Sequence, residues 1–147
     1  MASIRLAIPL AAPAADVWSA LADAGAVHER LARGFVVDTR LDGDCRIVTF
    51  DNGLIARELL VDVDDTAHRI AYAVVESSLG LRHHHASMEV VAEGDRRSRL
   101  LWIADVAPDA AAPAVTEFMR LGADAIRRTF EEGDRMSPVT QPHDDGG

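Results

Sequence analysis

SRLLWIADVAPDAAAPAVTEFMRLGADAIRRTFEE, residues 98–132, is the stretch that decides the fold. Every second residue of its first half is apolar, namely Leu100, Trp102, Ala104 and Val106. This alternation predicts a half-buried strand, which Pro108 ends. From about Pro113 to Glu132 the spacing becomes that of an α-helix, the longest helical pattern in the chain. The apolar face of this helix comprises Val115, Phe118, Met119, Gly122, Ala125, Ile126 and Thr129.

Upstream of this stretch, short segments with period-two alternation follow one another closely. They cover residues 35–41, 45–50, 54–63, 68–76 and 83–92. Asp-Gly and Asn-Gly pairs at 42–43 and 52–53, and Gly94 between the last two strands, are typical hairpin turns. Strands joined this tightly predict an antiparallel meander.

The N-terminal part supplies one more strand and two short helices. Ile4 to Leu10 alternates like a strand, and Pro9 favours a place at the sheet edge. A helix is expected after Pro13, and a second short helix at about 27–32.

The order of elements predicts an α+β, helix-grip protein. A curved seven-stranded antiparallel sheet should wrap around the long C-terminal helix, with the two short helices after strand 1. Residues 1–132 should form one domain and 133–147 a polar C-terminal tail. Because the short helices are too small to fill the open end, an apolar pocket is expected between sheet and helix.

Composition excludes several kinds of function. The 147 residues include no lysine, so Schiff-base and P-loop lysine chemistry are excluded. Cys45 is the single cysteine, which rules out an internal disulfide. The net charge of −9 disfavours nucleic acid and anionic membranes as partners. The apolar N-terminal run is too short to span a bilayer, so we predict a cytoplasmic protein without membrane insertion or cofactor.

Five short motifs carry a family resemblance: PAADVW at 13–18, ARELLVDVDD at 56–65, HRIAY at 68–72, HHASMEV at 84–90 and LWIADVAPD at 101–109. In this order the chain resembles the START-like (SRPBCC) superfamily, in particular its polyketide cyclase/dehydrase and lipid-transport branch. The resemblance implies a helix-grip fold around a cavity for a hydrophobic small molecule. It implies no single reaction, because members include carriers, receptors and cyclases.

Glu58 is the first candidate for chemistry. It shares the inward parity of Leu54, Ala56 and Leu60. Burial there would favour its protonated form, which suits a general acid or base. The alternatives are a salt bridge to a neighbouring Arg and a solvent-facing position at an edge.

His83, His84 and His85 form a run of histidines in a strand. Their side chains alternate between faces, so the three cannot bind one metal, and no metal site is expected. His84 shares parity with Met88 and is a candidate polar group or acid/base of the pocket. His85 is kept as a candidate ligand-binding residue, the alternative being a strand start partly in solvent.

The other candidate ligand-binding residues are Tyr72, Met88, Trp102, Asp105, Phe118, Met119 and Gly122. Tyr72 and Trp102 offer flat apolar walls with one polar atom each, and could equally be ordinary core aromatics. Met88 and Met119 have flexible side chains that can line an irregular pocket. Gly122 lowers helix stability, and its presence implies close packing or room for a ligand. Asp105 faces away from Trp102 by parity, and is retained because it matches the family's WxxD…P pattern.

Three functions follow. The first is binding of a small hydrophobic or aromatic, polyketide- or lipid-like molecule by a carrier or sensor, with Glu58 and His84 orienting its polar end. The second is a polyketide cyclase/dehydratase-type enzyme in which Glu58 or His84 moves a proton. The third is a protein-interaction module without a cavity. A monomer or a homodimer fits each of them.

Overall fold

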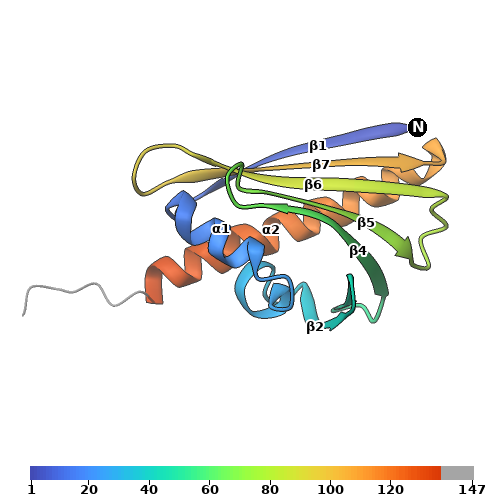
Figure 1. The fold of residues 1–147 in the computed structure, drawn as a ribbon, viewed down its shortest axis with the longest axis horizontal. Helices are drawn as coiled ribbons and strands as arrows, with labels where there is room; N and C mark the ends of the chain where they lie inside the picture. The colour runs from blue at the N-terminus through green and yellow to red at the C-terminus, as the bar shows by residue number, and fades with distance from the viewer. Residues whose placement is uncertain (137–147) are drawn as a thin grey trace, which may run out of the picture.

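The computed structural model describes residues 1–136 and contains the predicted order of elements (Figure 1). The elements are β1 (Ala2–Leu10), α1 (Ala14–Ala22), η1 (Val27–Leu31), β2 (Val36–Asp42), β3 (Cys45–Phe50), β4 (Ile55–Asp64), β5 (Arg69–Glu76), β6 (His83–Ala92), β7 (Ser98–Ala107), η2 (Asp109–Ala111) and α2 (Ala112–Met136). The α+β, helix-grip prediction is confirmed, including the two short helices after strand 1, the second of which is a π-helical segment.

The seven strands form one antiparallel sheet in the order β1-β7-β6-β5-β4-β3-β2. The meander from β2 to β7 is therefore as predicted, and β1 returns to pair with β7, placing Leu6 opposite Trp102. β1 is an edge strand, as Pro9 predicted. Proline has no N–H to donate, so it is tolerated in a strand that has a neighbouring strand on one side only. Gly43 and Gly94 adopt positive φ angles of 59° and 85° in two of the hairpin turns.

The sheet curls around α2, and irregular pairing accounts for the curl. The register shifts between Val36 and Asp38 in β2, and twice along β4, next to Glu58 and between Leu60 and Asp62. Such irregularities bend a strand and increase its twist. As a result β4 curves downward and β2 lies on the far side of α2 from β1 (Figure 1).

The helix α2 packs its predicted face on the concave side of the sheet. Val115, Met119, Gly122, Ala125, Ile126 and Thr129 are buried, and Phe118 is half-buried. The helix continues to Met136, so residues 133–136 of the expected tail are helical. The rest of that tail, residues 137–147, lies outside the described residues. Within residues 1–136, no helix combines the length and apolar character needed to cross a membrane.

The first short helix is held against the turn between β4 and β5. Trp18 of α1 donates a hydrogen bond from Nε1 to Oδ1 of Asp65 over 3.1 Å, and its ring stacks on His68 at 5.4 Å. Val17 and Leu21 of the same helix are buried in the core. These contacts close one end of the concave face, and the other end becomes the site described below.

Candidate functional site

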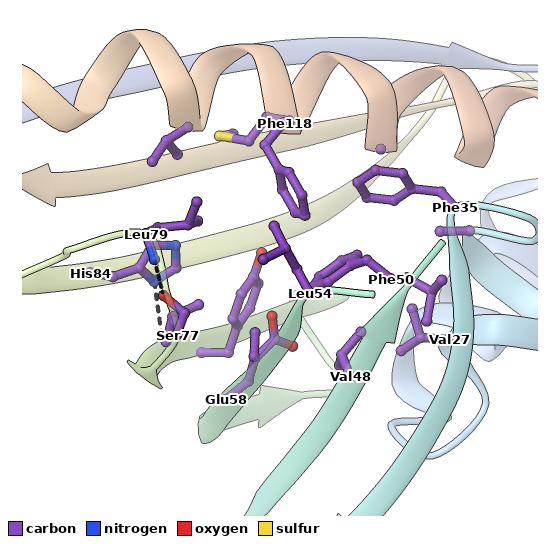
Figure 2. Close-up of a pocket in the computed structure, with 18 of the residues that line it drawn as sticks. Val27, Phe35, Val48, Phe50, Leu54, Glu58, Ser77, Leu79, His84 and Phe118 are labelled. Atoms are coloured by element: carbon purple, nitrogen blue, oxygen red, sulfur yellow. Dashed lines mark hydrogen bonds between the residues drawn. The ribbon is translucent and has the colours of Figure 1, made fainter. Parts of the chain in front are cut away.

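A pocket of about 100 Å³ lies between the concave face of the sheet, α2, η1 and the loop 77–81. Its wall is mostly apolar, and both the sheet and the helix contribute to it. In Figure 2, Phe118 reaches down from α2 toward Leu54 and Phe50, while Glu58 and His84 approach from the strands. The gap expected from the small size of the two short helices is at this position.

Eight of the ten candidate site residues line this pocket. They are Glu58, Tyr72, His84, Met88, Trp102, Phe118, Met119 and Gly122. The strand residues among them lie inward because parity is preserved along the segments that carry them. The first register shift has its extra residue, Val75, in β5, and the second lies beyond Glu58, at Val61. The alternation of Leu54, Ala56 and Glu58 in β4 is therefore intact. The parity argument therefore identified strand residues that face this pocket.

The structure does not place His85 and Asp105 at this pocket. β6 and β7 pair without any irregularity from His83 to Ala92, so their side chains alternate strictly. His85 and Asp105 are partners in this register and lie on the outer face, opposite to His84, where Asp105 accepts a hydrogen bond from Ser3 Oγ. His83 shares this outer face, and no three His, Cys, Asp or Glu residues in the described part of the chain form a group that could hold a metal.

Glu58 is paired with a residue that the sequence reasoning missed. Arg46 is opposite Glu58 in the β3–β4 register, and its Nε donates a hydrogen bond to Oε1 of Glu58 over 2.7 Å. The two residues are 3% and 8% exposed, so the ion pair is buried, and both line the pocket. The salt-bridge alternative for Glu58 is therefore correct, and so is its inward orientation.

Tyr72 and Trp102 form the second polar contact of the pocket wall. The indole Nε1 donates a hydrogen bond to the Tyr72 hydroxyl over 3.0 Å. Arg46 lies over the Tyr72 ring, with its Cζ 5.3 Å from the ring centroid, which is cation–π geometry. Burial, and next the charge of Glu58, raise the pKa of Tyr72, so its hydroxyl keeps its proton and can donate it in a hydrogen bond.

His84 is held as a neutral ring. Its Nδ1 accepts a hydrogen bond from the backbone N–H of Val74 over 3.0 Å, so in the neutral ring the proton is on Nε2. Burial, and next the charges of His85 and His83, together lower the pKa of His84 to about 4. At neutral pH the ring therefore offers Nε2–H as a hydrogen-bond donor.

Three phenylalanines form one end of the pocket. Phe35 packs on Phe50 and Phe118 with ring-centroid distances of 5.2 and 5.0 Å, and Phe50 meets Phe118 edge-on at 4.6 Å. Phe118 was a candidate, whereas Phe35 and Phe50 were overlooked. For Phe50, the available signal was its alternation with Val48 in β3.

A long helix gripped by a curved antiparallel sheet, with a pocket between them, defines a START-like helix-grip protein. The chain belongs to the polyketide cyclase/dehydrase and lipid transport family, whose model matches residues 1–131. The resemblance drawn from the sequence motifs is thereby confirmed. No curated protein matches the chain in sequence.

Solved structures share the fold. A protein from Thermobifida fusca is 27% identical, with a TM-score of 0.75 over 93% of this chain and 96% of that one. A START superfamily protein from Mycobacterium smegmatis is 11% identical, with a TM-score of 0.71 over 88% and 97%. Norcoclaurine synthase from Thalictrum flavum, in complex with dopamine and hydroxybenzaldehyde, is 21% identical, with a TM-score of 0.67 over 89% and 87%.

Proposed function

We propose that this protein binds a compact hydrophobic or aromatic molecule in the pocket between the sheet and α2, as a carrier or sensor. The observation that carries the proposal is the composition of the pocket wall. Apolar side chains from both layers surround a small group of polar residues, of which Arg46, Glu58 and Tyr72 are buried and His84 is half-buried. Ligand sites have this character, in which apolar surface supplies affinity and a few polar atoms fix orientation.

Binding is favoured over acid–base catalysis because the two candidate bases are already held by protein donors. Oε1 of Glu58 accepts from Arg46, and Nδ1, the one lone pair of the neutral His84 ring, accepts the Val74 N–H. A general base needs a free lone pair directed at the proton that it removes. The cyclase/dehydratase function remains the alternative, and Glu58→Gln would then abolish turnover of a polyketide substrate while sparing binding. The predicted cytoplasmic location and the monomer or homodimer state stay predictions.

Nuclear magnetic resonance of methionine methyl groups tests the proposal. Met88 and Met119 line the pocket from β6 and α2, so their methyl resonances report on anything that enters it. Titration with ethylbenzene, an apolar probe of one aromatic ring, should shift both resonances saturably. Unchanged Met88 and Met119 resonances at the solubility limit of ethylbenzene would overturn the proposal.

Adjacent valines provide a matched pair of variants. Val74 lines the pocket, whereas Val75 is 56% exposed on β5. Val74→Phe adds a ring inside the pocket and should weaken ethylbenzene binding at least about 10-fold, because the volume is already small. Val75→Phe adds the same ring outside and should leave binding within about 2-fold. Equal effects of the two variants would place the ligand elsewhere.

A further inference from the structure

The exposed apolar side chains of the sheet are concentrated in the half that ends with β2. Seven of the nine large hydrophobic residues that are exposed in the described chain belong to β2, β4 and β5, namely Val37, Leu41, Ile55, Leu59, Val61, Val63 and Val75. The strands of the other half, β1, β7 and β6, contribute none of the nine. Apolar side chains gathered at a surface commonly mark a place that meets another molecule.

β2 leaves one side of this half open. It pairs with β3 on one side, and in the described chain no strand pairs with its other side, which is the free edge (Figure 1). Natural edge strands are commonly protected against further pairing by proline and by charge. The opposite edge strand, β1, contains Pro9, whereas β2 contains no proline. The free edge of β2 can therefore accept another strand.

The hairpin register shows which residues of β2 direct their backbone groups to the free edge. Asp42 and Cys45 are paired across a two-residue turn, so their N–H and C=O groups bond within the hairpin. This direction alternates along an antiparallel pair. The backbone groups of Arg40 therefore point to β3, and those of Thr39 and Leu41 point to the free edge. A strand added there would bond to Thr39 and Leu41.

The charged side chains beside the free edge are complementary to the same residues of a second copy. The register of β2 is regular from Asp38 to Asp42, and Asp38 and Arg40 are exposed on either side of Thr39. Within residues 1–136 neither Asp38 nor Arg40 forms an ion pair. If two β2 strands pair about a two-fold axis at Thr39, Asp38 of each copy lies opposite Arg40 of the other.

The charges favour this register over the neighbouring one. A two-fold axis at Arg40 would place the two Arg40 side chains opposite each other, and Asp38 opposite Asp42. Like charges directly opposite each other on paired strands are destabilising, whereas opposite charges are stabilising. In the Thr39 register, Asp38 and Arg40 also occupy the positions without hydrogen bonds, where facing side chains approach each other most closely.

We propose that two copies of this protein associate through the free edges of β2, with a two-fold axis at Thr39, so that their sheets form one continuous antiparallel sheet. Such self-complementary interfaces are the commonest in homo-oligomers. The charges of Asp38 and Arg40 balance within the interface, although the chain has a net charge of −9. Val37 and Leu41 are exposed at the two ends of the paired segment, so association also removes apolar surface from water.

Analytical ultracentrifugation over a concentration series tests the proposal. The wild type should show a reversible equilibrium between monomer and dimer. Asp38→Arg and Arg40→Asp each place like charges opposite each other at both symmetry-related positions. Each variant should therefore raise the dissociation constant of the dimer about 10-fold or more. Both side chains are exposed, so the variants should keep the wild-type circular dichroism spectrum.

An equimolar mixture of the two variants tests the register. One chain then has a basic residue at both positions and the other an acidic residue at both, so all facing charges are opposite. The mixture should dimerise within about 2-fold of the wild-type affinity. Arg5→Asp is the matched control, because Arg5 is exposed on the other edge strand, β1. It should leave the dissociation constant within about 2-fold of the wild-type value, since distant surface charges are screened.

Three results would overturn the proposal. A wild type that remains monomeric at millimolar concentration excludes the dimer and leaves the free edge to a different partner. A wild-type dimer that neither Asp38→Arg nor Arg40→Asp weakens must form through another surface. If both variants are monomeric and their mixture is monomeric too, the pairing about Thr39 is wrong. None of these results bears on ligand binding in the pocket.

Discussion

The indole Nε1–H of Trp102 donates a hydrogen bond to the hydroxyl of Tyr72 over 3.0 Å, which joins β7 to β5 across the intervening β6. Both side chains are buried, at 8% and 4% exposure. The contact fixes the indole against α2, where Gly122 lies directly above it. It also fixes the Tyr72 ring beneath Arg46. One hydrogen bond thus sets the position of the pocket's aromatic wall.

Tyr72→Phe should destabilise the protein by about 1–3 kcal/mol. The ring remains, but the Trp102 N–H is left buried without an acceptor, and the cost is its desolvation. Urea denaturation of the wild type and the variant measures the loss. The double variant Tyr72→Phe/Trp102→Phe removes both partners and should be more stable than the sum of the single losses predicts. If the losses in unfolding free energy are additive, the hydrogen bond contributes no coupling free energy between Tyr72 and Trp102.

Gly122→Ala should weaken binding of an apolar probe in the pocket. A Cβ at this position would lie 3.0 Å from Trp102 Cη2 and 3.3 Å from Phe35 Cε2, so the indole must move into the space available to a ligand. The measurement is ethylbenzene affinity from the Met88 and Met119 methyl shifts.

Gly133→Ala is the matched control on the same helix. A Cβ there meets nothing within 4 Å. This variant should keep the wild-type affinity and gain up to about 1 kcal/mol from helix propensity. Unaltered ethylbenzene affinity in Gly122→Ala would show that the indole does not border the ligand.

Arg46→Met should be among the most destabilising single substitutions in the pocket wall. It leaves the Glu58 carboxylate buried without a counter-ion, a change that typically costs about 3–5 kcal/mol. Arg46→Met/Glu58→Leu should lose markedly less, because no charge is left behind. Urea denaturation at pH 7 compares the two. A double variant that is less stable than Arg46→Met would contradict the conclusion that Arg46 and Glu58 neutralise each other's charge in the protein interior.

Sequence reasoning placed Trp102 correctly because one face of its strand is wholly apolar, whereas the other face carries Arg99 and Asp105. In β7 every inward residue from Leu100 to Val106 is apolar and buried, which made Trp102 predictable. In β3, Arg46 alternates with Val48, but Ile47 makes the opposite face apolar as well. Parity alone therefore could not assign Arg46 to the interior. The sequence predicted the partner of Glu58 only as an unspecified Arg.

His85 and Asp105 are residues whose face of the sheet could not be predicted from the sequence of their own strands. Both were retained as candidates, one from a run of histidines and the other from a family pattern. Their positions depend on whether β6 and β7 pair without a bulge, a property of the paired strands that neither segment's own sequence contains. The curl of the sheet depends in the same way on shifts beside Glu58 and Leu60. Sequence periodicity predicts which residues of a strand share a face. The pairing between strands decides which of these faces lie together in the folded sheet.

His84 should titrate at low pH and make stability depend on pH. Burial lowers its pKa from 6.5 in the unfolded chain to about 4 in the folded protein. Between these values the unfolded chain binds more protons than the folded one, so the stability from this group is complete above about pH 6.5 and falls as the pH drops toward 4. The expected loss is on the order of 1–3 kcal/mol. Below pH 4 the contribution of His84 stays constant.

The control is His84→Asn, whose side-chain oxygen can still accept the Val74 N–H but does not titrate. Denaturation curves at pH 7, 5.5 and 4 should show a smaller loss in His84→Asn than in the wild type. The ring protons of His84 should shift with a midpoint near pH 4 in a nuclear magnetic resonance titration. A midpoint near 6.5 would mean that the ring is solvated, and the neutral donor assigned to it in the pocket would then be lost in mildly acidic solution.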